Sequence, residues 1–314
     1  MPVLHDKEKL NKLLLENGVS ISDAIARSRF YAEHFDWDSL SEEYTQGSSI
    51  RDLCKETGLS YDTVRINLIR KLGSLRKFSV KGSSKFSFYT SHFDPHVDEI
   101  GSYFLGWMYS DGCITDNKIT ITLKGNDFDH LSYLSSLVSD KPVRFNTKKN
   151  VATFDYYGVD LCRMFQLDLG VHKRKSFSDY LIPIQMFSDS CVPYLLLGLL
   201  EGDGSIAKSS LSCQLLLTSN TWNSLSVYLN KVVDLTKVTT VQLNDYGLLC
   251  VNFRGVSYFS LLSYIYLNTR KVKPLPRKFQ RFLNQLDRSS NGRTSPYKKL
   301  AVNIRDSLSN TDLI

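Results

Sequence analysis

Two apolar runs, each nine residues long and each ending in Asp-Gly, form the strongest pattern in the chain. The first, FLGWMYSDG, occupies residues 104–112, and the second, LLGLLEGDG, occupies residues 196–204. Both have glycine as the third residue, and a proline stands near the start of each, Pro95 and Pro193. Apolar runs bounded by proline and glycine in this way predict two short buried helices.

The residues at the ends of these predicted helices indicate chemistry. We expect Asp94 to cap the first helix, and Gly112 and Gly204 to stop the two helices. Asp111 and Asp203 then fall in the last turns, where the partial negative charge of a helix C-terminus disfavours a carboxylate by about 0.3–1 kcal/mol. A single Asp-Gly after a helix is usually an ordinary turn. Two copies in matching surroundings predict instead an anionic pocket, which suits a hard divalent cation with oxygen ligands.

The pattern that follows each Asp-Gly is also the same. Apolar and polar residues alternate over residues 119–124 and again over residues 211–218, which predicts strands with one polar face. A helical pattern, a second hairpin and a further helix follow in both places. The chain therefore contains an internal repeat of roughly 95 residues with the element order α-β-β-α-β-β-α.

With both motifs in this context, the chain resembles the LAGLIDADG homing endonucleases, in particular their single-chain class with two copies of the motif. The resemblance covers about residues 95–285. It implies an α+β fold of two pseudo-symmetric αββαββα halves, each with a saddle-shaped antiparallel sheet that lies on duplex DNA. The motif helices are expected to pack together at a pseudo-two-fold axis, with Gly106 and Gly198 at their contact.

The resemblance also implies a metal site. In that family the acids at the eighth motif position bind divalent metal, so the ligands here are Asp111 and Asp203, with Gly112 and Gly204 beside the cation. Paired divalent metals about 4 Å apart position the attacking water and stabilise charge in phosphodiester hydrolysis. We expect Mg²⁺ as the cofactor, with Mn²⁺ as a substitute and Ca²⁺ supporting binding without cleavage.

The sixth motif position is often an acid in the family, and the first copy departs from this pattern. It is Tyr109 in the first copy and Glu201 in the second. Residues two apart on a helix project about 200° apart. Glu201 and Asp203 therefore do not both face one metal ion, and we take the eighth position as the ligand.

Basic residues near the pocket are expected to stabilise the charge that develops on the phosphate. By their approximate position in the family, these are Lys173 or Lys175 in the first half and Lys273 in the second. Among them, we predict Lys175 and Lys273 as the catalytic pair.

The polar strand faces are expected to lie in the major groove, where Lys and Arg read guanine edges and Gln and Asn read adenine. In the first half, the predicted DNA contacts are Lys118, Thr120, Thr122, Lys124, Arg144, Asn146, Lys148 and Lys149. In the second half, they are Ser212, Gln214, Thr218, Gln242, Asn252 and Arg254.

A region of different pattern precedes the repeat. Leu53, Leu59 and Val64 are expected to form a small core between two helices joined at Gly58, whose turn needs a positive φ. This is the spacing of a helix-turn-helix, and it would direct Tyr61 and Arg65 toward a major groove. A plain three-helix cap on the endonuclease is the alternative.

The predicted boundaries follow from these patterns. Residues 77–94, rich in Ser, Gly and Lys, indicate a linker, in which Lys81 and Lys85 either follow DNA phosphates or are simply solvated. The predicted parts are a helical domain at 1–76, the linker at 77–94, a first half at 95–188, a second half at 189–287 and a polar tail at 288–314.

Composition bears on the expected partner and on the cellular compartment. The net charge of +7 favours a nucleic-acid partner only weakly. The six cysteines include no Cys-x-x-Cys pair, which argues against zinc ribbons and disulfide frameworks. It favours a reducing intracellular compartment, in a prokaryote, a phage host or an organelle. No apolar run reaches about 18 residues, and the N-terminus lacks a secretory pattern, so we expect no membrane span. The resemblance implies a monomer with internal pseudo-two-fold symmetry bound to double-stranded DNA.

Three functions remain open on this pattern. A site-specific double-strand endonuclease is favoured because a degenerate relative is expected to lose one of the two aspartates. A non-cleaving DNA-binding regulator or an intron RNA maturase is the alternative, and Tyr109 in place of an acid is the one hint of it. An intein-embedded nuclease is disfavoured because the chain lacks a closing His-Asn, which leaves an intron-encoded or free-standing protein as the expectation.

Overall fold

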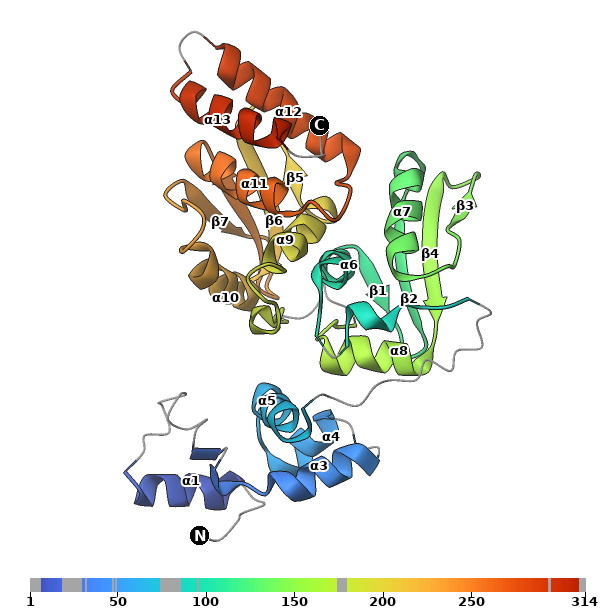
Figure 1. Ribbon diagram of the computed structural model, residues 1–314, viewed down its shortest axis with the longest axis vertical. Helices are drawn as coiled ribbons and strands as arrows, with labels where there is room; N and C mark the ends of the chain where they lie inside the picture. The colour runs from blue at the N-terminus through green and yellow to red at the C-terminus, as the bar shows by residue number, and fades with distance from the viewer. Residues whose placement is uncertain are drawn as a thin grey trace. The chain divides into compact units, whose positions relative to one another are not determined.

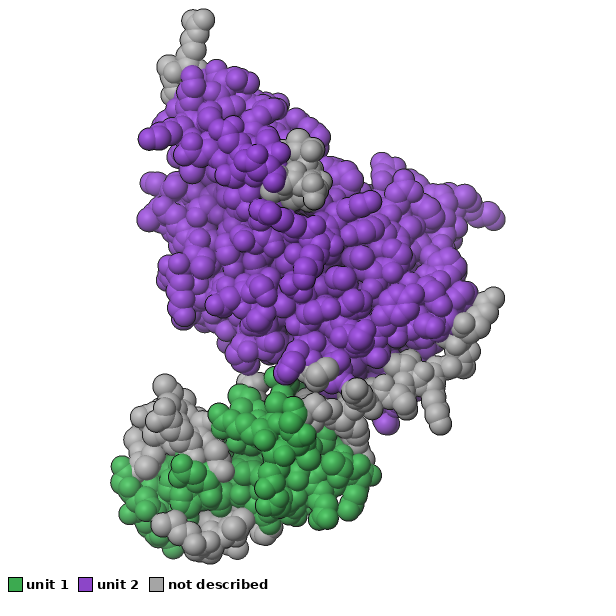
Figure 2. All heavy atoms as spheres, viewed as in Figure 1, with its two compact units in different colours: residues 1–78 green, residues 79–314 purple. Residues whose placement is uncertain are grey.

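The computed structural model describes residues 7–18, 30–31, 33–46, 48, 50–73, 86–94, 96–173, 180–292 and 295–310. The chain forms two compact units, residues 1–78 and 79–314, which Figure 2 shows in different colours. Among the described residues, no helix is both long enough and apolar enough to cross a membrane.

The first unit is a group of helices around a small core of its own. Leu53, Leu59 and Val64 are buried in that core, as their spacing predicts. Gly58 joins two of the helices with φ at 68°, and the Ser60 hydroxyl accepts a hydrogen bond from the next helix's Thr63 N–H at 3.2 Å. Among the described residues of this unit, the helices are α1 (Lys7–Glu16), α3 (Trp37–Gln46), α4 (Ile50–Thr57) and α5 (Tyr61–Leu72).

The second unit contains the predicted repeat. Each half has a four-stranded antiparallel sheet, and the strand orders correspond: β1-β2-β4-β3 in the first and β5-β6-β8-β7 in the second. The first half comprises η1 (Thr90–His92), α6 (Glu99–Tyr109), β1 (Gly112–Ile114), β2 (Lys118–Lys124), η2 (Gly125–Asp127), α7 (Phe128–Val138), β3 (Arg144–Asn146), β4 (Val151–Tyr157), α8 (Val159–Arg163) and the π-helical turn η3 (Met164–Asp168).

The second half repeats this order and adds two helices. It comprises η5 (Ile184–Met186), α9 (Val192–Glu201), β5 (Ser205–Ile206), β6 (Ser212–Thr218), α10 (Ser219–Leu229), β7 (Val238–Gln242), β8 (Leu248–Arg254), α11 (Val256–Asn268), α12 (Pro276–Asn291) and α13 (Lys298–Ser309). The α+β fold of two corresponding halves is therefore as the sequence predicts. In Figure 1, α6 and α9 lie at the centre of this unit, with one sheet on either side.

The two motif helices touch along their glycines. A Cβ atom on Gly106 would lie 2.4 Å from the carbonyl oxygen of Leu195 and 2.8 Å from the Cα of Gly198. A Cβ on Gly198 would lie 2.4 Å from the carbonyl oxygen of Tyr103. Only glycine fits at either position, and the predicted contact between Gly106 and Gly198 is confirmed.

Several boundaries differ from the sequence predictions. The motif helices end at Tyr109 and Glu201 with Ser110 and Gly202 as C-caps, so Gly112 and Gly204 do not stop them, and Asp111 and Asp203 follow the last turns. The N-cap of α6 is Asp98, whose carboxylate accepts from the Gly101 N–H at 2.8 Å, and not Asp94. Phe88 and Phe93, placed in the predicted linker, are buried in the second unit. Much of the predicted polar tail is helical, since α12 continues to residue 291 and α13 buries Ala301, Ile304 and Leu308 along one side.

Candidate functional site

The C-terminal ends of α6 and α9 meet, and each is followed by a motif aspartate. A Cβ on Gly202 would lie 1.9 Å from the Ser110 hydroxyl oxygen and 3.5 Å from the backbone nitrogen of Asp111. Asp111 and Asp203 are both exposed. Because Gly202 directly precedes Asp203, the glycine contact brings both aspartates to the same place, as the repeat predicts.

A lysine occupies the end of α9. The ammonium nitrogen of Lys278, on α12, lies 2.6–3.1 Å from four carbonyl oxygens, those of Leu200, Glu201, Gly202 and Gly204. Lys278 is only 2% exposed, and an ammonium has three N–H donors that these carbonyls share. The carbonyls at a helix end carry partial negative charge, so this ammonium satisfies and neutralises the end of the second motif helix.

The charges around Lys278 shift its pKa in opposite directions. Burial lowers the pKa of Lys278 to about 8, and the positive charge of Arg277 acts in the same direction. The negative charges of Glu201, Asp111 and Asp203 oppose this shift. Both motif aspartates therefore act on one buried ammonium, which is the basic residue that the structure adds to the predicted site.

The sequence pattern did not identify Lys278 as a residue of the site and predicted Lys273 as the basic residue of the second half. The backbone N–H of Lys273 donates to the hydroxyl of Tyr133, and its ammonium lies over that ring, 5.7 Å from the centroid. A signal for Lys278 does exist: it falls on the apolar face of α12, whose pattern includes Phe279 and Phe282. A lysine on the buried face of an amphipathic helix needs acceptors, because a buried charge without partners is costly.

The end of α6 is held differently. The hydroxyl of Tyr180 donates to the carbonyl oxygen of Tyr109 at 2.9 Å, and the Ser110 hydroxyl donates to the carbonyl oxygen of Gly106 at 2.9 Å. Burial and the negative charge of Asp203 both raise the pKa of Tyr180. The last turn of the first motif helix is thus held by the neutral hydroxyl of Tyr180, and the charge of Asp203 in the second half acts on that hydroxyl.

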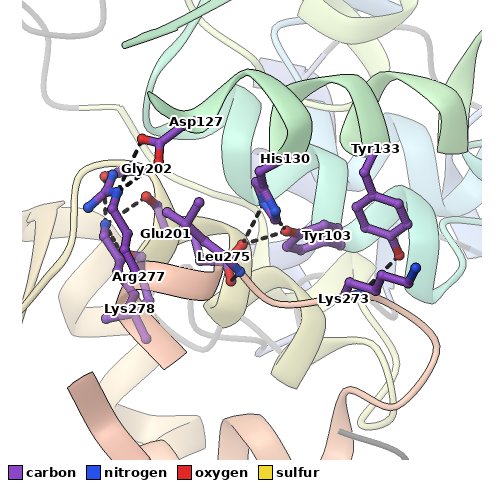
Figure 3. A network of polar contacts seen from close by, with 11 residues as sticks. Tyr103, Asp127, His130, Tyr133, Glu201, Gly202, Lys273, Leu275, Arg277 and Lys278 are labelled. Atoms are coloured by element: carbon purple, nitrogen blue, oxygen red, sulfur yellow. Dashed lines mark hydrogen bonds and ion pairs between the residues drawn. The ribbon is translucent and has the colours of Figure 1, made fainter. Parts of the chain in front are cut away.

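Glu201 points into the interface between the halves, away from solvent (Figure 3). Its carboxylate is fully buried and accepts hydrogen bonds from the hydroxyl of Tyr103 and the backbone N–H of Leu275. The Nε2 of His130 lies 3.4 Å from the carboxylate and 2.9 Å from the Tyr103 oxygen. Burial and the charge of Glu201 raise the pKa of Tyr103 well above its ordinary value.

The other sixth-position residue is also buried. Tyr109 is 1% exposed, and its hydroxyl donates to the carbonyl oxygen of Leu169. Both sixth-position side chains are therefore buried and hydrogen-bonded, in contrast to the exposed aspartates at the eighth position.

A groove of about 410 Å³ opens beside Asp111. On one side, Arg277 from the second half donates to both carboxylate oxygens of Asp127 in the first half, at 3.0 and 3.1 Å. Figure 3 shows this pair next to Lys278. The groove is lined by Asp111, Thr122, Leu123, Lys124, Asn126, Asp127 and Arg277. It joins one motif aspartate to the open face of the first sheet.

The donor set suits a hard divalent cation. Two exposed carboxylates at adjoining helix ends are oxygen ligands of the preferred kind and leave room for water and phosphate oxygens. Within the described ranges, no cluster of three or more His, Cys, Asp or Glu side chains offers a metal site. Gly204, predicted beside the cation, instead has its carbonyl oxygen 2.6 Å from the Lys278 ammonium. The other predicted neighbour, Gly112, begins β1 where a Cβ would meet Met108.

The polar face of the first sheet is arranged as predicted. Within β2, the side chains of Ile119, Ile121 and Leu123 are buried on one face of the sheet. The other residues of β2 lie on the opposite face, together with their partners on β4 and β3. That face carries Lys118, Thr120, Thr122, Lys124, Arg144 and Asn146, and the exposed turn carries Lys148 and Lys149.

The second sheet departs from prediction at three positions. Thr218 is 2% exposed, and its hydroxyl caps α10 by accepting from the Thr221 N–H, so it is not on the open face. Gln242 pairs with Leu249, which puts it on the face opposite Asn252. Asn252 is on the open face but is 8% exposed, and its side chain accepts a hydrogen bond from Gln214. Ser212, Gln214 and Arg254 lie on that face as expected.

The remaining predicted residues lie in several places. Lys81, Lys85 and Lys175 are outside the described residues. The ammonium of Lys173 forms an ion pair with Asp116. In the first unit, Tyr61 packs partly against the core, and Arg65 on the same helix α5 is half-buried.

Comparison with known proteins adds structural neighbours only, since no family model and no curated protein matches the chain. A double variant of I-DmoI, bound to its target DNA nicked in the coding strand and in the presence of 2 mM Mn, is 14% identical with a TM-score of 0.38, covering 55% of this chain and 95% of that chain. The LAGLIDADG meganuclease I-CpaMI, bound to uncleaved DNA, is 12% identical with a TM-score of 0.35, covering 66% and 98%.

WhiA is a further neighbour. Its N-terminal LAGLIDADG domain is 16% identical with a TM-score of 0.33, covering 53% of this chain and 82% of that chain. The full-length protein from Thermatoga maritima is 13% identical with a TM-score of 0.30, covering 68% and 81%. Because these scores are low, the function is argued below from this chain's own residues. By structure, the chain is similar to LAGLIDADG homing endonucleases and to the LAGLIDADG domain of WhiA.

Proposed function

We propose that this protein is a site-specific double-strand DNA endonuclease that hydrolyses phosphodiester bonds with a divalent cation. The observation that carries the proposal is the meeting of two exposed aspartates, Asp111 and Asp203, where α6 and α9 end side by side. This meeting point lies between two sheets of corresponding topology, so one duplex lying across both sheets passes the aspartates at its centre.

Asp111 and Asp203 are the residues that hold the cation in this proposal. When bound, a divalent cation lowers the pKa of a water molecule and stabilises negative charge on the phosphate. Mg²⁺ is the proposed ion, Mn²⁺ a substitute and Ca²⁺ an ion that supports binding without cutting. The exposure of both carboxylates supports this choice, because Mg²⁺ keeps several of its waters.

The chain's own basic residues have two tasks in the proposal. Lys278 fixes the last turn of α9 by holding its carbonyl oxygens, and so positions the loop that carries Asp203. A pKa of about 8 keeps its ammonium largely protonated at neutral pH, which offsets the repulsion between the two aspartates. Lys124 and Arg277 line the groove beside Asp111, and in the proposal they contact DNA phosphates.

A non-cleaving DNA-binding regulator is the second candidate. The observation in its favour is the first unit, where α4 and α5 meet at Gly58 with the spacing of a helix-turn-helix. Both candidates bind duplex DNA, so only a cleavage assay separates them.

The test is to incubate the protein with a library of long duplexes and to sequence any ends that form. With Mg²⁺ we expect ends at one long target site, and with Ca²⁺ we expect the same target to be shifted in a gel but not cut. A chelator should abolish the ends. A target that is bound with high preference and is never cut with Mg²⁺ or Mn²⁺ would contradict the nuclease and support the regulator.

A further inference from the structure

The open faces of the two sheets can be matched position by position. Cys113 and Ser205 each follow their motif aspartate by two residues, and they pair with Thr120 and Gln214 respectively. Thr120 and Gln214 are therefore equivalent. From this pair of equivalent residues, the strand register assigns an equivalent in the second sheet to each remaining position on the open face of the first sheet.

Two residues after Thr120 and Gln214, at Thr122 and Leu216, the two open faces differ in chemistry. The first sheet has a polar row across β2, β4 and β3, and the second has an apolar row across β6, β8 and β7. The first row is Thr122, Thr153 and Arg144, and the second is Leu216, Cys250 and Val241. The next position along the outer strand is Asn146 in the first sheet and Leu243 in the second, where the Leu243 N–H donates to the carbonyl oxygen of Leu248.

The apolar side chains of the second sheet are accessible. Val241 is 53% exposed and Leu243 is 51% exposed, and Leu216 and Cys250 are partly exposed. Single exposed aliphatic residues are normal on protein surfaces, but these lie next to one another in register on one face. At the place equivalent to Val241, the guanidinium of Arg144 is held 2.9 Å from Asp155 and remains 68% exposed.

These rows lie near the paired aspartates. Thr122 lines the same groove as Asp111, and Leu216 is its equivalent in the second half. Farther along the same face of the second sheet, the chain keeps polar groups that suit DNA, such as Gln214 and Arg254. The face is therefore continuous with a polar DNA-facing surface, and only its part next to the site is aliphatic.

We propose that the two sheets read half-sites of different base chemistry, and that the second sheet contacts thymine methyl groups close to the cutting position. The inference rests on the proposed function, because it needs both sheets to lie in the major groove. There, the C5 methyl of thymine is the apolar group that Leu216, Val241 and Leu243 can contact. The first sheet offers Arg144 and Asn146 at the equivalent places, whose partners are guanine and adenine edges.

The first experiment selects a target from a randomised duplex library with the parent protein in Ca²⁺, so that binding is measured without cleavage. In the selected duplex, thymidine is then replaced by deoxyuridine in one half-site at a time, which removes only the methyl groups. We expect the dissociation constant to rise about fourfold for each methyl removed next to the cutting position on the second sheet's side. The same replacement on the other side should change it less than twofold.

The second experiment assigns the half-sites and tests the residues. Val241→Arg puts a guanidinium at the place equivalent to Arg144, and repeated selection should replace thymine by guanine at the facing position. The matched control is Val227→Arg on α10, a residue that is 66% exposed and is not part of the sheet. It should leave the selected sequence unchanged.

The outcomes separate this inference from the proposed function. Failure to select any duplex would overturn both. A well-defined target that tolerates deoxyuridine in both half-sites, or keeps its sequence with Val241→Arg, would overturn the inference alone. Self-association of the protein that Val241→Arg abolishes would assign the aliphatic row to a second copy of the chain and would likewise overturn it.

Discussion

The two halves of the second unit have the same backbone plan but hold their motif helices by different chemistry. In the first half a neutral hydroxyl, that of Tyr180, donates to the end of α6. In the second half a buried ammonium, that of Lys278, holds the end of α9. The glycine contact and the sheet order, by contrast, correspond closely. Close backbone approach leaves no choice of residue, whereas a helix end can be satisfied by several side chains, so the halves diverge there.

The largest expected effect concerns what the halves share. Gly106→Ala and Gly198→Ala should each destabilise the protein by about 3 kcal/mol or more, because the added Cβ meets backbone atoms that cannot move aside. Urea unfolding measures this, and the two costs should be similar. Ser136→Ala on the exposed side of α7 is the control, with an expected change within about 0.5 kcal/mol. A small cost at one glycine would break the correspondence between the halves.

The next largest effect concerns the ends of the two motif helices, which the halves hold by different side chains. Lys278→Met removes a buried charged donor from carbonyl oxygens at the end of α9, and we expect a loss of about 1.5–3 kcal/mol. Tyr180→Phe removes one neutral hydrogen bond from the end of α6, and we expect about 1 kcal/mol. Equal losses in urea unfolding would show that the two ends are held with the same strength.

A smaller difference in stability is expected between the first hairpins of the two halves. In the second half, Gln285 on α12 is 2% exposed and donates to the carbonyl oxygens of Ala207 and Ser210. In the first half, Gln166 donates to the carbonyl oxygen of Thr115 at 3.0 Å. Gln285→Leu should cost about 1 kcal/mol and speed hydrogen exchange near Ala207, whereas Gln166→Leu should cost about half as much. Unchanged exchange near Ala207 would remove α12 as the support of that hairpin.

The smallest effect tests the first unit. Arg70 is exposed on α5, and if it contacts a phosphate, Arg70→Gln should lower the slope of log affinity against log salt by about one. Lys299→Gln, at an exposed position on α13, is the control and should leave the slope unchanged. A slope that Arg70→Gln does not alter would indicate that this unit supports the fold without contacting DNA.

Much of the frame was predictable because it is encoded locally. The apolar runs and the alternation around Ile119 and Ile121 report burial directly. The closing glycines were assigned two residues too far along, since Ser110 and Gly202 cap the helices. The approach of Gly106 to Gly198 followed from the repeat, which placed the same small residue at the same point of two helices.

The errors have non-local causes. Lys278 is buried by acceptors that lie about a quarter of the chain away, at Leu200 and its neighbours, and no local pattern identifies them. Gln242 was assigned to the wrong face because a shift of one residue in register reverses every side chain of a strand. Thr218 ends a strand and caps the next helix at once, and capping decides where its hydroxyl points.

The central claim is that Asp111 and Asp203 together hold the cation that cuts DNA, and single replacements by asparagine test it most directly. Asp111→Asn and Asp203→Asn keep the shape and remove one charge each. With Mg²⁺, we expect each variant to lose double-strand cleavage of the selected target, while gel-shift affinity in Ca²⁺ stays within about tenfold of the parent protein because most contacts lie on the sheets. Retained double-strand cutting in either variant would contradict the account, and loss of binding together with cutting in a folded variant would assign that aspartate to DNA binding instead.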